Sequence, residues 1–229
     1  MPSIIFPDPR NHDFAEWAMF GEFYYPAKDI VGFGGELTLE NLTKAYQKGI
    51  FPWHIDGLPL PWFCPERRAI LEFEKLHVPK SLKKAWRNTK FTFSIDKDFG
   101  SVISNCAKVK RSHESGTWIT DDFIHAYIDF HKAGNAHSVE VWMEDKLVGG
   151  LYGIDADGVF CGESMFFKQS NASKLALLYL IEHLKTRGST WLDIQVMTPH
   201  LEVLGAHELD RIEFLDKLKS EQEKNLRLF

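Results

Sequence analysis

The segment from His137 to Val196 constrains the fold of this chain most, because its elements follow one another in an order that few architectures share. It is predicted to contain strands at residues 137–143, 146–154 and 159–167, an amphipathic helix at 172–187 and a strand at 191–196. The turns at Glu144-Asp145 and Asp155–Gly158 are too short for anything but antiparallel neighbours. We therefore predict a β-meander followed by a helix and a further strand, which is an α+β arrangement.

Elements on both sides of this segment extend the prediction. A helix is expected at Leu39–Lys48, where Thr38 can cap the N-terminus and Gly49 follows the end. Loops are expected at 32–35, 51–53 and 61–65, helices at 79–87, 99–106, 121–133 and 210–225, and a strand at 91–95. We predict a small N-terminal α/β domain over residues 1–72. The larger domain, over residues 73–229, matches the N-acetyltransferase-like (GNAT-like) fold, with a mixed, mostly antiparallel sheet flanked by helices.

The composition is that of an ordinary globular protein. Of the 229 residues, 44% are hydrophobic and 26% charged, which excludes a disordered tail, a collagen-like repeat and a coiled-coil rod. No apolar run approaches the roughly 20 residues of a membrane helix, and the start MPSIIFPDPRNHDF does not resemble a signal peptide. The cysteines Cys64, Cys106 and Cys161 form no C-x-x-C pair. We expect a cytoplasmic monomer with no disulfide framework and no membrane partner.

Positive charge is concentrated in one part of the chain. Residues 75–118 contain ten Lys or Arg and three Asp or Glu, so this stretch carries +7 while the remainder carries −12. A helix at 79–87 would bury Leu82 and leave Lys80, Lys83, Lys84 and Arg87 in solvent. Lys108, Lys110 and Arg111 form a second cluster. Either these are ordinary solvated charges, or they form a face that contacts phosphate.

Motifs for common cofactors and nucleophiles are missing from the sequence. The junction at residues 167–174 lacks the Q/R-x-x-G-x-G/A loop that would hold the pyrophosphate of acetyl-CoA. The sequence contains no P-loop, no G-x-G-x-x-G after a strand, no H-E-x-x-H and no G-x-S-x-G. Cys161 lies within a predicted strand and is interpreted as a packed core thiol. We expect neither a cofactor nor a metal.

Polar residues within apolar strands are the strongest candidates for chemistry. Glu163 lies in the third meander strand, and Asp193 and Gln195 alternate with apolar residues, which predicts that both point to one face of the strand at 191–196. That face of the strand could simply be exposed to solvent. If the strand is interior, the two polar groups require partners, and in a cleft a substrate can be one of them.

Several segments together resemble the family of bacterial leucyl/phenylalanyl-tRNA–protein transferases. The similar segments are Gly34-Gly35-Glu36-Leu37, Tyr46-Gln47-Lys48-Gly49-Ile50-Phe51-Pro52-Trp53, Trp62-Phe63-Cys64-Pro65, Gly116-Thr117-Trp118-Ile119, His137-Ser138-Val139-Glu140-Val141-Trp142, Gly149-Gly150-Leu151-Tyr152-Gly153, Cys161-Gly162-Glu163-Ser164-Met165-Phe166, Asn171-Ala172-Ser173-Lys174 and Asp193-Ile194-Gln195-Val196. They follow the family's order along nearly the whole chain.

The resemblance implies an aminoacyltransferase. Leu or Phe, and more weakly Met, would pass from Leu-tRNA or Phe-tRNA to the α-amino group of proteins that begin with Arg or Lys, marking them for N-degron degradation. By resemblance, Asp193 and Gln195 orient the acceptor amine and help to remove its proton, while Glu163 holds the basic terminus or a substrate amine.

The resemblance also implies two binding surfaces. The aminoacyl-adenosine would contact Trp53, Trp118, Gly162, Leu151, Met165, Leu177, Leu180 and Ile194, and the tRNA would contact Lys80, Lys83, Lys84 and Arg87. The two tryptophans could instead be ordinary core residues. The competing interpretations of the whole chain are another acyltransferase of the same fold and a non-catalytic tRNA-binding protein.

Overall fold

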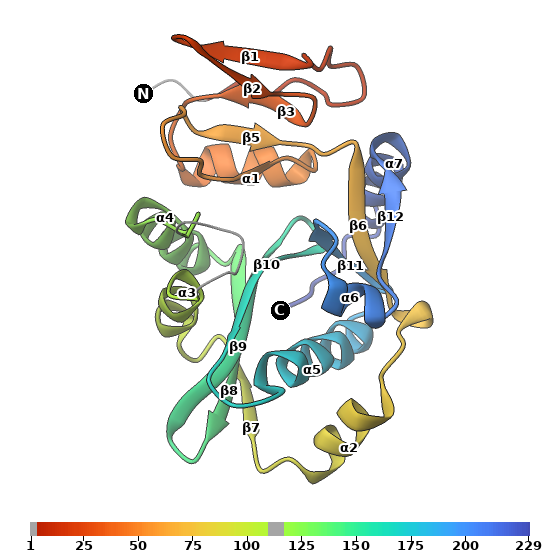
Figure 1. Cartoon of the computed structure of the whole chain (residues 1–229). Helices are drawn as coiled ribbons and strands as arrows, with labels where there is room; N and C mark the ends of the chain where they lie inside the picture. Colours follow the sequence, from red (N-terminus) through yellow and green to blue (C-terminus); the bar gives the residue numbers. More distant parts are fainter. Residues whose placement is uncertain (1–3, 110–116) are drawn as a thin grey trace.

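A computed structural model describes residues 4–109 and 117–229 of the chain. Its N-terminal part consists of two small sheets and one helix (Figure 1). The hairpin pairs β1 (Trp17–Phe20) with β2 (Phe23–Pro26), and the three-stranded sheet has the order β3-β5-β4, made of Ile30–Phe33, Pro61–Phe63 and Phe51–Pro52. Together with α1 (Leu39–Gln47), they form a layer next to one end of the larger sheet (Figure 1).

The larger sheet contains seven strands within the described ranges, in the order β12-β6-β11-β10-β9-β8-β7. In chain order these are β6 (Arg67–Glu72), β7 (Thr92–Ile95), β8 (Ala136–Met143), β9 (Lys146–Asp155), β10 (Phe160–Phe167), β11 (Trp191–Gln195) and β12 (His207–Asp210). β10 and β11 are parallel, with Cys161 opposite Asp193, whereas the other neighbours are antiparallel. The predicted meander, α+β class and mixed sheet are therefore confirmed.

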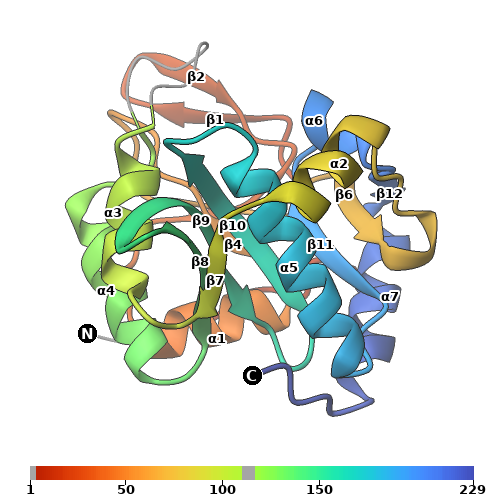
Figure 2. The same ribbon diagram turned by 90° about the horizontal axis from the view of Figure 1, so that it is seen from below.

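Helices cover both faces of this sheet (Figure 2). One face carries α3 (Phe99–Ala107) and α4 (Asp121–Lys132), and the other carries α5 (Ala172–Thr186). Successive strand residues point to opposite faces, so Tyr152 packs in the cluster with α3 and α4 while its neighbour Leu151 packs in the cluster with α5. The sheet thus separates two hydrophobic cores.

The helices begin and end close to the predicted residues. Thr38 caps α1 by accepting a hydrogen bond from the backbone N–H of Asn41 at 3.2 Å, and Asp98 caps α3 in the same way through Ser101 at 3.1 Å. The remaining helices are a 3₁₀ turn at Phe73–Lys75, α2 (Lys80–Asn88), α6 (Pro199–Val203) and α7 (Arg211–Gln222). Across residues 4–109 and 117–229, every helix is too short or too polar to cross a bilayer.

The strands from the N-terminal third differ from the prediction. The loops expected at 32–35, 51–53 and 61–65 contain the end of β3 and the short strands β4 and β5. Pro52 and Pro61 lie at strand ends, where a missing N–H costs little. β6, which the predicted boundary at residue 72 assigns to the first domain, pairs with β11 and β12 in the larger sheet. Both of its partners lie far along the chain, so its place in the larger sheet is not visible from its own residues.

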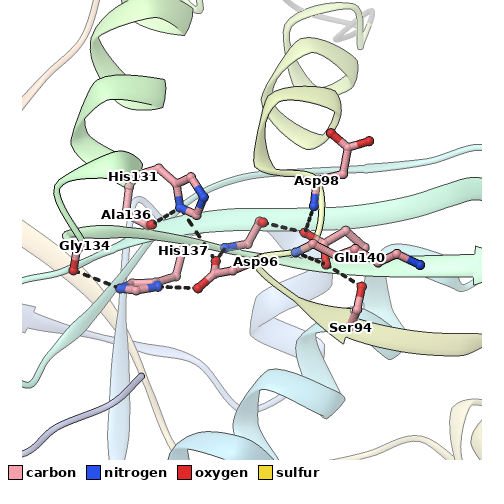
Figure 3. Close-up of polar contacts among 10 residues, drawn as sticks. Ser94, Asp96, Asp98, His131, Gly134, Ala136, His137 and Glu140 are labelled. Carbon is pink, nitrogen blue, oxygen red and sulfur yellow. Dashed lines mark hydrogen bonds and ion pairs between the residues drawn. The ribbon is translucent and has the colours of Figure 1, made fainter.

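A buried polar cluster fixes β7 and α3 to the sheet (Figure 3). Glu140, on β8, is fully buried and accepts hydrogen bonds from the hydroxyls of Ser94 and Ser138 at 2.6 and 2.5 Å and from the backbone N–H groups of residues 97 and 98 at 3.3 Å. Nearby, His137 bonds Asp96 at 2.7 Å. The described residues contain no group of three or more His, Cys, Asp or Glu side chains placed to hold a metal ion. The contacts of the cluster are structural.

We predict that Glu140→Ala lowers the free energy of unfolding by about 2–3 kcal/mol, because it leaves buried donors without an acceptor. Urea unfolding measures this change. Glu182→Ala is the matched control, since the Glu182–Lys185 pair is exposed and its loss should cost less than about 1 kcal/mol. Equal effects of the two substitutions would show that the cluster does not stabilise the junction.

Candidate active site

A cavity of about 390 Å³ opens where the parallel strands β10 and β11 meet. Its walls come from both strands, from β9, from α5 and α6, and from the two tryptophan segments. The lining residues are Trp53, Trp118, Leu151, Tyr152, Phe160, Gly162, Glu163, Ser164, Met165, Leu177, Leu180, Leu192, Ile194, Gln195, Val196, Thr198, His200 and Leu201. Most are apolar, so the few polar groups among them fix how a ligand can lie.

Two irregularities in the strands turn polar side chains into this cavity. The register of β10 against β9 shifts between Gly162 and Ser164, so Glu163 is an extra residue. The register of β11 against β6 shifts between Asp193 and Gln195, and Gln195 adopts a left-handed backbone with φ of 61°. A bulge redirects side chains, and for this reason Gln195 lines the cavity together with its neighbour Ile194.

The two oxygens of the Glu163 carboxyl group differ in their hydrogen bonds. Oε1 accepts hydrogen bonds from the hydroxyl of Tyr46 and from the side-chain amide of Gln195, both at 2.7 Å, and Tyr46 is bonded in turn to Tyr127 at 2.5 Å. Oε2 is buried and has no partner among the described residues. Burial raises the pKa of Glu163 to about 7, against the opposing effect of the two hydrogen bonds.

We predict that this pKa makes the protein less stable as the pH rises. The folded state holds a proton on Glu163 that the unfolded chain releases near its ordinary pKa of 4.5. Stability therefore falls between about pH 4.5 and 7, by about 3 kcal/mol in all. Glu163→Gln removes this component.

Urea unfolding of the wild type and of Glu163→Gln at pH 5 and pH 7.5 measures the difference. The wild type should lose more stability than the variant between these two values. The same pH dependence in both proteins would mean that Glu163 ionises as it does in water.

Asp193 lies on β11, two residues before Gln195. It is fully buried and pairs with the guanidinium of Arg68 through two hydrogen bonds, at 2.8 and 2.6 Å, and Oδ1 also accepts from the backbone N–H of Gln195 at 2.8 Å. A bulge at Ile194 interrupts the alternation of the strand between Asp193 and Gln195. Both side chains nevertheless connect to the N-terminal layer, Asp193 through Arg68 to Gly49 and Gln195 through Glu163 to Tyr46. Asp193 does not line the cavity.

We predict that Asp193→Ala costs about 3–5 kcal/mol of unfolding free energy, because it leaves the buried charge of Arg68 unpaired. Urea unfolding measures the loss. Asp129→Ala, which removes only the exposed pair with Lys132, should cost less than about 1 kcal/mol. Adding Arg68→Met to Asp193→Ala should restore part of the loss, and strict additivity of the two substitutions would contradict the pairing.

The structure brings together all eight residues predicted to contact the aminoacyl-adenosine. Each of them lines the cavity: Trp53, Trp118, Leu151, Gly162, Met165, Leu177, Leu180 and Ile194. The rings of Trp53 and Trp118 contact each other, with centroids 5.0 Å apart and planes inclined by 30°. Trp118 is buried and Trp53 is partly exposed, so a further flat ring has the face of Trp53 on which to stack.

The four predicted tRNA-binding residues lie outside the cavity, on α2. Lys80, Lys83, Lys84 and Arg87 are exposed, and none forms an ion pair with a described residue, while Leu82 is buried. The helix packs against α5. In the second cluster, Lys108 is exposed at the end of α3, whereas Lys110 and Arg111 lie outside the described residues. Of the predicted motif 116–119, Gly116 also lies outside them.

Three polar residues around the two carboxylates were not predicted. Tyr46 and Tyr127 approach Glu163 from α1 and α4, and Arg68 approaches Asp193 from β6. On helices, the tyrosines show only the spacing of core residues, and Arg68 is the second of two adjacent arginines with no local sign of burial. Cys161 is buried, and burial raises the pKa of its thiol well above the usual value, as befits the predicted core residue.

Two family models match the chain. The model described as leucyl/phenylalanyl-tRNA protein transferase matches residues 70–219, and the model of that family's N-terminal domain matches residues 35–66. The gap between the two matches coincides with the start of β6, where the chain passes from the small sheet to the large one.

Similar proteins occur in several bacteria, each named leucyl/phenylalanyl-tRNA–protein transferase. One from Pseudoalteromonas atlantica is 50% identical over 83% of this chain and 81% of its own length. A relative from Flavobacterium johnsoniae is 46% identical over 88% of this chain and 98% of its own length. Another, from Pectobacterium carotovorum, is 42% identical over 96% of this chain and 88% of its own length. A solved structure titled "The structure of L-PGS from Bacillus licheniformis" aligns with a TM-score of 0.37 and 13% identity over 66% of this chain and 48% of that one.

Proposed function

The chain belongs to the family of leucyl/phenylalanyl-tRNA–protein transferases and is an aminoacyltransferase. We propose that it transfers Leu or Phe, and more weakly Met, from aminoacyl-tRNA to the α-amino group of proteins that begin with Arg or Lys. One observation carries the proposal: the described lining of an apolar cavity contains a single carboxyl group, Glu163, one oxygen of which is buried without a hydrogen-bond partner.

The apolar wall of the cavity is the slot for the transferred side chain. Leu151, Leu177 and Leu180 provide aliphatic surface, and Met165 provides a side chain that adapts to both branched and planar guests. A slot of this kind rejects charged side chains but separates similar apolar ones weakly. This supports the use of Leu, Phe and Met as alternatives.

The terminal adenosine of the donor lies at the tryptophan pair. Single-stranded RNA bases are commonly held by stacking on aromatic side chains. Because Trp53 and Trp118 already contact each other, the adenine stacks on the exposed face of Trp53 and does not enter between the two rings. The ester then points past Gly162 into the apolar slot.

Glu163 and Gln195 handle the acceptor amine. A free α-amine has a pKa near 8, and the pKa of Glu163 is raised to about 7, so Oε2, which has no partner among the described residues, can take the proton from the ammonium group at little cost. The amide oxygen of Gln195 accepts from the amine and orients it. Asp193 acts through Arg68 and the backbone of Gln195 and does not touch the substrate.

The reaction exchanges an ester for an amide. The neutral amine attacks the ester carbonyl, a C–N bond forms, and the bond from the carbonyl carbon to the ribose oxygen breaks. The second proton of the amine ends on the ribose oxygen, so donor and acceptor leave as a free tRNA and an extended protein. Because the ester is the higher-energy group, no ATP is consumed, and positioning of the two reactants supplies much of the acceleration.

Binding of the tRNA body is assigned to α2. Its exposed Lys80, Lys83, Lys84 and Arg87 lack carboxylate partners among the described residues, and contacts to phosphates would make the affinity fall as the salt concentration rises. The remaining parts of the proposal are a monomer that acts in the cytoplasm, a GNAT-like catalytic domain and a product that enters N-degron degradation. They rest on the family resemblance and on the order of elements along the chain.

Incubation with radiolabelled Leu-tRNA and a peptide that begins with Arg tests the proposal. We expect acid-stable label on this peptide and on one that begins with Lys, and none on a matched peptide that begins with Asp. Label on all three peptides would remove the acceptor preference, and no label on any of them would remove the activity.

Gln195→Ala is the site variant for the same assay. Loss of the oriented amide should lower kcat/KM by about 100-fold or more while the affinity for Leu-tRNA stays unchanged. Thr186→Ala, at the exposed end of α5, is the control and should react like the wild type. A Gln195→Ala protein of normal activity would contradict the role given to this residue.

A further inference from the structure

A second cavity, of about 830 Å³, lies next to the first and is formed by the ends of α3, β10 and α5. It shares Met165 and His200 with the first cavity. Its other lining residues are Asn105, Lys108, Val109, Phe166, Phe167, Lys168, Ser170, Asn171, Ser173 and Lys174. None of the roles assigned above uses this space.

The charged residues that line the second cavity are all basic. Lys108, Lys168 and Lys174 line it, and its described lining contains no Asp or Glu. None of the three lysines forms an ion pair with a described residue, whereas Lys44, Lys132 and Lys185 on other surfaces are each paired with a carboxylate. After burial, the charge of Lys174 is the second cause that lowers the pKa of His200, which places that charge beside the border of the two cavities.

The first turn of α5 also lines the second cavity. The side chain of Asn171, at the N-cap of this fifteen-residue helix, makes no capping hydrogen bond. The N–H of Ala172 donates to the carbonyl of Gln169 at 3.1 Å, and the N–H groups that follow it in the first turn have no side-chain acceptor. Ser173 is 5% exposed, and its hydroxyl forms no hydrogen bond with a described residue. Free N–H groups at a helix start, an open hydroxyl and three ammonium groups are all donors that suit phosphate oxygens.

We propose that this second cavity binds the phosphates of the single-stranded RNA tail just before the terminal adenosine of the donor. The inference rests on the proposed function, which places the adenosine in the adjoining cavity. A chain that leaves that cavity past Met165 and His200 enters the basic one directly. Beyond it lies α2, which packs against the same helix α5 and is assigned to the tRNA body, so the tail links the two surfaces.

Three donors separate this role from the rest of the site. Leucyl-adenosine has no internucleotide phosphate, a leucylated CCA trinucleotide has the tail alone, and Leu-tRNA has the tail and the body. The variants are Lys168→Gln and Lys174→Gln. Lys185→Gln is the matched control, because it lies at the other end of α5 in an exposed pair with Glu182.

We expect each cavity variant to raise KM about tenfold for the trinucleotide and for Leu-tRNA, which is the effect of losing one charge-assisted contact. The slope of log KM against log salt should fall by about 0.7 for each lysine. With leucyl-adenosine, the variants and the control should give the same kcat/KM, and the urea midpoints should match.

Equal kcat/KM of wild type and variants with the trinucleotide would overturn the proposal. An equal loss with leucyl-adenosine would also overturn it, since the lysines would then act in the first cavity. The outcome for the proposed function is separate: if the wild type transfers Leu from none of the three donors, the transferase assignment fails, whatever the lysines do.

Discussion

The ion pair between Arg68 and Asp193 is the contact on which the rest of the site depends. Both side chains are almost completely buried, and the guanidinium lies between the rings of Phe51 and Phe214, each 4.6 Å from its centre. Arg68 also donates to the carbonyl of Gly49 at 3.2 Å. One side chain thus ties the N-terminal layer, β6, β11 and α7 together. A buried charge is tolerated only with full pairing, so these elements keep a fixed relative position.

That fixed position determines how the polar groups of the cavity are presented. Asp193 holds the backbone N–H of Gln195, and this bond supports a left-handed residue directly after the bulge. The side-chain amide of Gln195 donates a hydrogen bond to one oxygen of Glu163. The hydroxyl of Tyr46, which is itself hydrogen-bonded to Tyr127, donates to the same oxygen. The second oxygen is left without a partner in a place from which water is largely excluded. Burial raises the pKa of this carboxyl for that reason, and the same burial gives it a proton affinity near that of an amine.

Under the two proposals, the neighbouring cavities recognise chemically different parts of one donor. The first is apolar and suits a side chain and a base, which gain from leaving water. The second is lined by lysines and helix-terminal N–H groups, which suit phosphates that remain partly hydrated. A charged polymer with an apolar group at its end needs both kinds of surface side by side. The two cavities meet at Met165 and His200, so the apolar and the basic surface lie next to each other.

The sequence by itself determined the elements whose signals are local. The meander strands, α1, α3, α4 and α5 follow from period, caps and turns, and the residues of the apolar slot were recognisable from motifs along the chain. Only the tertiary structure decided the place of β6, the bulge at Ile194, and the approach of Tyr46, Tyr127 and Arg68 to the carboxylates. The physical reason is that a bulge adds one residue without a local signature, and a buried ion pair joins residues 125 positions apart. Such contacts are chosen by the energy of the assembled core, and no short stretch of the sequence encodes them.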